Sequence, residues 1–83
     1  MQVEHCERMI IEGRLEGETF LPWIERHARK LGLSQIVRHA DGTRIALDLC
    51  GPAELIDAME MGCLLGPIEV WVEGIARSAA PGR

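Results

Sequence analysis

Eighty-three residues are enough for one small domain and leave little room for a second. Close to half of them, 47%, are apolar, which indicates a packed globule rather than a disordered tail. The formal net charge of −4 at pH 7 argues against a nucleic acid partner, and a single Phe with no Tyr gives no platform for stacking bases. No apolar run approaches the length of a membrane span, so we expect no membrane partner.

The three cysteines, Cys6, Cys50 and Cys63, are odd in number and lack the Cys-x-x-Cys spacing of a zinc site. We therefore predict reduced thiols in a cytoplasmic protein, with Cys63 in the core. His5 and Cys6 could begin a metal site with a third soft ligand, but we interpret them as an N-terminal pair without a ligand. We expect neither a metal nor another cofactor.

The first half of the chain predicts a strand, a loop and a helix. A short, partly β-branched segment stops at Gly13, which suits a strand over residues 8–12, and a loop follows over residues 14–19. Apolar residues then recur at helical spacing from residue 20 to 31, and Gly32 is a natural helix stop. The expected buried stripe consists of Phe20, Ile24, Ala28 and Leu31.

The second half predicts a hairpin, a helix and a last strand. Asp41-Gly42 supplies the backbone angles that a tight hairpin turn needs, and alternation of apolar residues marks the strands. Gly51-Pro52 opens the helix, because proline is tolerated in a first helical turn. The expected elements are strands over 35–39 and 44–49, a helix running to about Leu65 with Met59 packed inside and Met61 on its surface, and a last strand over 68–72.

The resulting order is β-α-β-β-α-β. It predicts an α+β, ferredoxin-like sandwich, in which two helices cover one face of a four-stranded antiparallel sheet. We expect the domain to span residues 1–77 and a flexible C-terminal tail to follow over residues 78–83. Because this fold hosts many unrelated functions, the function must be argued from motifs.

Four segments of the chain resemble the acylphosphatase family. Gly13-Arg14-Leu15-Glu16-Gly17-Glu18-Thr19-Phe20-Leu21 is similar to the family signature G-x-V-Q-G-V-G-F-R. Leu31-Gly32-Leu33, followed by Ile36-Val37-Arg38-His39, resembles L-G-L-x-G-W-V-R-N. Asp41-Gly42 matches the hairpin turn, and Gly66-Pro67 matches the start of the late G-P-x-x-A-x-V. The spacing holds over nearly the whole chain, apart from one residue lost between His39 and Asp41.

The resemblance implies hydrolysis of carboxyl-phosphate anhydrides in a site built around the first loop. Backbone N–H groups of that loop would wrap the phosphate. An arginine at the end of the signature would bind the phosphoryl oxygens, and an asparagine on the second strand would position water. In this chain those two positions hold Leu21 and His39. The expected anion-binding loop consists of Leu15, Glu16, Gly17, Glu18, Thr19 and Phe20.

These replacements predict a degenerate active site. Loss of one preorganised donor to a developing oxyanion typically costs about 2.7–4 kcal/mol. Glu16 and Glu18 would also repel a phosphate, and Thr19 replaces a glycine of the signature. We therefore predict a small binding or interaction module without efficient hydrolysis, whose ligand is a small anion such as an acyl phosphate, or a protein.

Two alternatives remain open. Arg14 or Arg38 could replace the lost charge and His39 could act as a general base, which would give a weakly active acylphosphatase. Trp71 falls on the side of the last strand that faces away from the helices, where it would either contact a partner protein or a second copy of the chain, or lie flat over Ile10. A structural, dimerising domain that uses this open sheet face is the second alternative.

Overall fold

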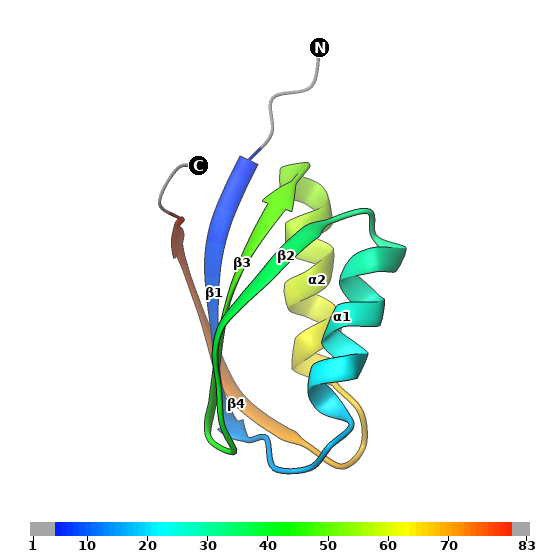
Figure 1. The fold of residues 1–83 in the computed structure, drawn as a ribbon, viewed down its shortest axis with the longest axis vertical. Helices are drawn as coiled ribbons and strands as arrows, with labels where there is room; N and C mark the ends of the chain where they lie inside the picture. The colour runs from blue at the N-terminus through cyan, green and yellow to red at the C-terminus, as the bar shows by residue number, and fades with distance from the viewer. Residues whose placement is uncertain (1–4, 81–83) are drawn as a thin grey trace.

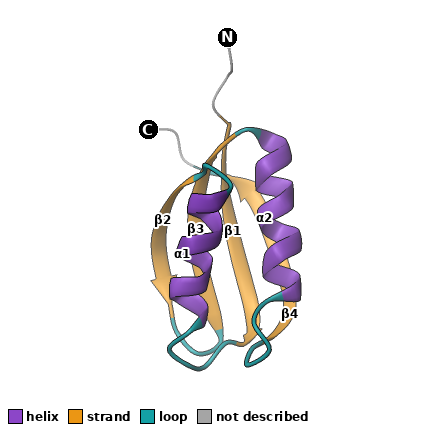
Figure 2. Cartoon of the chain, turned by 90° about the vertical axis from the view of Figure 1, so that its right-hand side faces the viewer, coloured by secondary structure: helices purple, strands orange, loops and turns teal. Residues whose placement is uncertain are grey.

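The computed structural model describes residues 5–80 and has the predicted order of elements. They are β1 (His5–Arg14), α1 (Phe20–Lys30), β2 (Ser34–Ala40), β3 (Arg44–Gly51), α2 (Ala53–Leu65) and β4 (Trp71–Ala79). The strands form one antiparallel sheet in the order β2-β3-β1-β4. Both helices lie on one face of this sheet and the other face is open (Figures 1 and 2). The predicted ferredoxin-like sandwich is confirmed.

The apolar core lies between the helices and the sheet. Alternation along β3 turns Ile45, Leu47 and Leu49 toward the helices, and each is no more than 3% exposed. The helices contribute apolar stripes, whose fully buried members are Phe20, Ile24 and Ala28 in α1 and Ile56, Met59 and Cys63 in α2. The prediction that Cys63 lies in the core is confirmed, and burial raises the pKa of its thiol to about 12.

The last strand lies further along the chain than the sequence pattern indicates. The predicted range was 68–72, but β4 begins at Trp71 and ends at Ala79. Ile68 lies in the turn before β4 with 98% of its surface exposed, so its alternation with Val70 reflects no strand. The bounds of β4 are set by its pairing with β1. This pairing includes Ser78 and Ala79, which therefore belong to the sheet rather than to the predicted tail. Residues 81–83 lie outside the described residues.

Arg77 links the edge strand β4 to β1 and α2 through hydrogen bonds. It lies opposite Met9, whose side chain belongs to the core, and so it faces α2. Its Nε and Nη2 atoms each donate to Glu7 at 2.7 Å, and its Nη1 donates to Asp57 and Glu60 at 2.8 Å. The hydrogen bonds from Arg77 hold the pKa of Glu7 at about 2, below its ordinary value of 4.5.

The Glu7–Arg77 pair predicts a loss of stability in acid. A carboxylate whose pKa is lower in the folded chain stabilises the fold above its ordinary pKa, and this contribution disappears as the pH falls from 4.5 toward 2. We expect the free energy of unfolding, measured with urea over this range, to fall less steeply in Glu7→Gln than in the unchanged protein. Glu54→Gln, at an exposed position of α2, is the control. Identical slopes for all three proteins would contradict the assignment.

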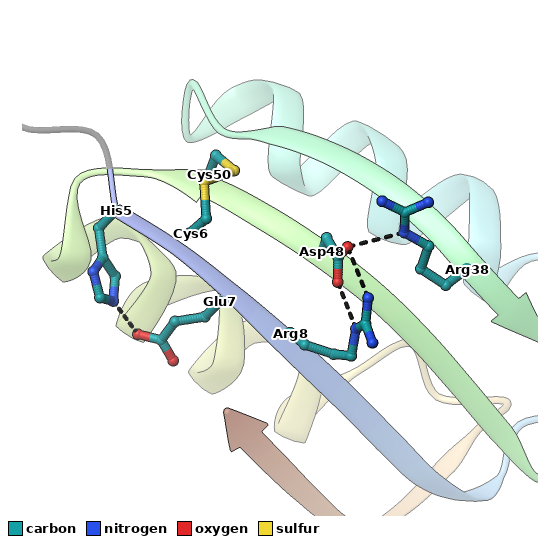
Figure 3. Close-up of a disulfide and its surroundings, with 7 residues drawn as sticks. All are labelled: His5, Cys6, Glu7, Arg8, Arg38, Asp48 and Cys50. Carbon is teal, nitrogen blue, oxygen red and sulfur yellow. Dashed lines mark hydrogen bonds and ion pairs between the residues drawn. A yellow bond between two sulfur atoms is a disulfide. The ribbon is translucent and has the colours of Figure 1, made fainter. Parts of the chain in front are cut away.

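Cys6 and Cys50 form a disulfide across β1 and β3, with their Cα atoms 4.1 Å apart (Figure 3). The prediction of reduced thiols is therefore wrong for these two residues and holds for Cys63, which is free. The two partners are 44 residues apart in the sequence, and only the strand register brings them face to face. Since reduced thiols supported the cytoplasmic location, that location stays a prediction.

Thiol counting tests the disulfide directly. We expect no thiol to react with an aromatic disulfide reagent in the folded protein, because Cys63 is buried and its thiol is held in the protonated form. One thiol should react after unfolding without a reductant, and three after unfolding with one. Three reactive thiols in the unreduced, unfolded protein would show that Cys6 and Cys50 are not joined.

Candidate functional site

Three connections meet at one end of the fold, and two of them line a cleft. They are the loop between β1 and α1, the hairpin turn between β2 and β3, and the connection between α2 and β4 (Figure 1). The cleft has a volume of about 440 Å³. Its lining residues come from the first loop, the start of α1 and the hairpin: Leu15, Glu16, Gly17, Phe20, Leu21, Ala40, Asp41, Gly42 and Ile45. Of the six residues of the predicted anion-binding loop, Leu15, Glu16, Gly17 and Phe20 therefore lie on one wall, and the Asp-Gly turn forms the other. Glu18 and Thr19 do not line the cleft.

The first loop is tied to the hairpin and to the α2–β4 connection. The N–H of Leu15 donates to the carbonyl of Gly42 at 2.8 Å, and the hydroxyl of Thr19 donates to a carboxylate oxygen of Glu69 at 2.6 Å. Within residues 5–80, no backbone carbonyl accepts a hydrogen bond from the N–H groups of residues 16–20. These donors, which lead into the positive end of α1, remain available to a bound group.

The charged side chains that line the cleft are both acidic. None of the nine lining residues is Lys, Arg or His, whereas Glu16 and Asp41 are carboxylates. The side chain of Glu16 lies over the turn, since a Cβ atom added to Gly42 would stand 2.7 Å from its Cγ. Asp41 accepts hydrogen bonds from the backbone N–H groups of Thr43 and Arg44, both at 2.8 Å. The bond from Thr43 is the main cause that lowers the pKa of Asp41 below its ordinary value, so its carboxyl is ionised at neutral pH.

Arg38 and His39 lie outside the cleft. Arg38 donates from its Nε atom to a carboxylate oxygen of Asp48 at 2.9 Å, on the open face of the sheet. The Nε2 atom of His39 lies 2.6 Å from a carboxylate oxygen of Asp41, and nearly half of the histidine side chain is exposed. Both side chains are therefore held by carboxylates and neither lines the cleft, although Asp41, the partner of His39, does.

Arg14 and Trp71 lie together on the open face. They are cross-strand neighbours in β1 and β4 and, with Glu73, line a shallow hollow of about 340 Å³ that is separate from the cleft. Trp71 is 67% exposed, and it pairs with Arg14, whereas Ile10 lies four positions away along β1 and pairs with Ala76, so Trp71 is not placed over Ile10. Arg14, Arg38, Trp71 and His39 thus all lie on the open face, and His39 is the one of these four that lies beside the hairpin turn.

Neither a metal centre nor a membrane span is found in residues 5–80. No group of three or more His, Cys, Asp or Glu residues there is placed to hold a metal ion. His5, considered as a ligand beside Cys6, instead lies 2.7 Å from a carboxylate oxygen of Glu7, while Cys6 is in the disulfide. In the same part of the chain, neither helix is long and apolar enough to cross a membrane.

Comparison with known proteins assigns the chain to a family. The acylphosphatase family model matches residues 7–79. The chain belongs to the acylphosphatase family. An acylphosphatase of Azorhizobium caulinodans is 32% identical over 76 residues, which cover 92% of this chain and 82% of the relative. The fold matches that of an acylphosphatase from Coxiella burnetii with a TM-score of 0.86, at 20% identity over 96% of this chain and 84% of the other. An acylphosphatase from Bacillus subtilis matches with a TM-score of 0.83, at 21% identity over 98% and 89%.

Leu21 occupies the position that the family signature gives to arginine. It lies in the first turn of α1, lines the cleft and packs half-buried against the core. An uncharged side chain therefore stands beside the free N–H groups of the loop, where the family pattern has a guanidinium.

A β-bulge determines the side of the sheet that His39 faces. The pairing of β2 with β3 shifts between Val37 and His39, which leaves an extra residue in β2. His39 then lies opposite Ala46, on the open face, and Ala40 lies opposite Ile45, on the face of the cleft. The side chain on the cleft side is therefore a methyl group. The resemblance places His39 at the asparagine position of the family, and a match of sequence patterns does not show which face of the sheet a residue occupies.

Gly13 fixes the start of the loop, which yields a stability prediction. Its φ angle is +153°, and a Cβ atom there would stand 2.1 Å from the carbonyl oxygen of Trp71. Because the obstacle is backbone, we expect Gly13→Ala to lower the free energy of unfolding by more than about 2 kcal/mol. Gly74→Ala is the matched control, since nothing lies within 4 Å of its added Cβ atom. Urea unfolding measures both, and equal losses would contradict the close approach.

Proposed function

We propose that this member of the acylphosphatase family does not hydrolyse acyl phosphates efficiently and acts as a small binding or interaction module. The observation that carries the proposal is the lining of the cleft, which offers Glu16 and Asp41 but no cationic side chain. A phosphoryl group brings two negative charges, and binding it requires a site of positive potential.

Two energetic terms oppose hydrolysis. Removing one preorganised donor to the transition state costs about 2.7–4 kcal/mol, or roughly a hundred- to a thousandfold in rate, and Leu21 replaces a group with several donors and a full charge. Each carboxylate at about 5 Å from a phosphate charge adds a repulsion of roughly 1–3 kcal/mol at the dielectric of a protein surface. The N–H groups of residues 16–20 are left as a cradle that can receive a small anion only weakly.

The alternative of a weakly active hydrolase has one observation in its favour, namely that the curated relatives bear the name acylphosphatase. The positions of its proposed substitutes oppose it. Arg38 and His39 are each engaged by a carboxylate, and Arg14 lines the hollow on the open face. For Arg14 or Arg38 to reach the cleft, a strand pairing or an ion pair would have to open, and His39 contacts only Asp41 at the edge of the cleft.

Hydrolysis of benzoyl phosphate tests the proposal. We expect the protein to turn this substrate over at least about a hundredfold more slowly than the A. caulinodans relative under the same conditions. The variant Leu21→Arg/Ala40→Asn restores both family groups on the cleft side and should gain about tenfold or more.

Leu64→Arg is the matched control for the added charge. Leu64 is 45% exposed on α2 and does not line the cleft, so its arginine raises the net charge without entering the site. This control should leave turnover unchanged. Turnover by the unchanged protein at the relative's rate would overturn the proposal, and Arg14→Gln and Arg38→Gln would then show which substitute is used.

A further inference from the structure

The open face of the sheet carries a fixed pair of guanidinium groups. Arg8 donates from Nε to one carboxylate oxygen of Asp48 at 2.8 Å and from Nη2 to the other at 3.1 Å. Arg38 donates from Nε to the second oxygen at 2.9 Å (Figure 3). Asp48 is only 7% exposed, although it lies on a face that no element covers. The side chains of Arg8 and Arg38 remain 33% and 52% exposed, respectively. The trio of Arg8, Arg38 and Asp48 therefore presents a net charge of +1 to solvent.

The strands beneath the trio are cross-linked. Cys6 and Cys50 lie two residues before Arg8 and two after Asp48, and they join β1 and β3 on the same face (Figure 3). A covalent bond and an ion pair therefore fix neighbouring positions of the two central strands. Binding to groups that are already held loses less conformational entropy than binding to mobile side chains.

Donors remain after the bonds to Asp48 are made. Among the described residues, the hydrogen bonds of Arg38 use its Nε atom alone, and those of Arg8 leave Nη1 unused. The two Nη groups of Arg38 form a planar fork, which matches the two oxygens of a carboxylate. Ile36, directly opposite Asp48 on β2 and 55% exposed, adds an apolar contact beside the fork.

An aromatic contact lies at the far end of the same face. Trp71 pairs with Arg14, whose side chain points to the same side of β1 as that of Arg8. Arg14 lies six positions beyond Arg8, which is about 20 Å along β1 at roughly 3.3 Å per residue. Arg38 and Trp71 lie on the two edge strands, β2 and β4, so a segment that contacts both crosses the sheet diagonally. An extended segment of at least seven residues could touch both ends. Trp and Arg are also the residue types that dominate binding energy at protein interfaces.

We propose that the open face binds an extended acidic segment of a partner protein, with a carboxylate on the fork of Arg38 and an apolar side chain on Trp71. This names the surface and the partner class of the module proposed above, and it rests on that proposal for its biological role. The contacts themselves lie on the face opposite the helices and are independent of the cleft.

A second copy of the chain cannot supply this carboxylate from its own open face. Each acid there already has an arginine beside it: Asp48 is bound by Arg8 and Arg38, Glu12 lies opposite Arg44 in the pairing of β1 with β3, and Glu73 shares its hollow with Arg14. A nucleic acid is a poor candidate for this face, because its phosphates extend beyond the face and would be repelled by the rest of a chain whose net charge is −4. A short acidic segment would interact mainly with the net positive charge of Arg8, Arg38 and Asp48, since salt screens the more distant charges of the protein.

A random library of twelve-residue peptides, displayed on phage and selected on the immobilised protein, tests the proposal without a known ligand. We expect enriched peptides to carry Asp or Glu at one position and a large apolar residue about six positions away. The consensus peptide is then synthesised and its affinity is measured by titration calorimetry, with glutamine in place of the acid as the peptide control.

Arg38→Gln should weaken the consensus peptide tenfold or more, because it removes the fork and leaves Arg8 on Asp48. Trp71→Ala should weaken it as well. Arg29→Gln, at an exposed position of α1, removes the same charge from the opposite side of the molecule and should change the affinity less than twofold. Amide spectra of each variant establish that it is folded.

Three results would overturn the proposal: no enrichment, enrichment without acidic residues, or equal effects of Arg38→Gln and Arg29→Gln. A dimer in sedimentation equilibrium that dissociates in Trp71→Ala would assign the face to a second copy instead. None of these readouts depends on hydrolysis, so this inference and the proposed loss of activity can fail separately.

Discussion

The antiparallel pairing of β1 with β3 determines the character of both faces of this small sheet. In this register the odd-numbered residues of both strands turn toward the helices, where Met9, Ile11 and Leu47 are completely buried. The same register sends the even-numbered residues to the open face and sets Cys6 opposite Cys50 and Arg8 opposite Asp48. A shift by one residue would place the charged set in the core, so the apolar alternation enforces the register. The disulfide and the ion pair then reinforce it.

The cleft depends on how the remaining connections are tied to this central pair. The close approach of Gly13 to the backbone of β4 and the hydrogen bond from Leu15 to the hairpin hold the first loop at the edge of the cleft. Leu21 and Ala40 line this cleft, and Glu16 brings a carboxylate over the turn. We propose that the backbone of the family is kept here, while the site has lost the positive charge that a phosphate requires.

The order of elements and the buried helical stripes could be predicted from the sequence, because both follow from local periodicity and from the Gly and Pro residues at element ends. The buried position of Cys63 followed from the same periodicity. The disulfide could not be predicted, since nothing local indicates that residues 44 positions apart will pair. The bounds of β4 were missed because Ile68 and Val70 alternate by chance in a turn.

Within the site, the loop and Leu21 could be located from the signature, whereas the roles of Ala40 and Glu69 required three-dimensional information. The bulge reverses the side of the sheet on which the residues after Val37 point, and a sequence match carries no such information. Glu69 meets Thr19 only because two connections far apart in the chain gather at one end of the sandwich. The positions of Arg14 and Arg38 on the open face likewise follow from the strand register and from the bulge. Matching sequence motifs does not reveal either of these features.

The measurement that tests the central claim most directly is a titration of the ¹⁵N-labelled protein with inorganic phosphate, followed at the amide resonances of residues 16–20. A cleft with two carboxylates and no cation should show only small, unsaturated shifts at millimolar phosphate, and the same amides should saturate once Leu21→Arg restores the charge. Saturable shifts of these amides in the unchanged protein would contradict the account, because they would show that the loop captures a phosphoryl group without the missing arginine.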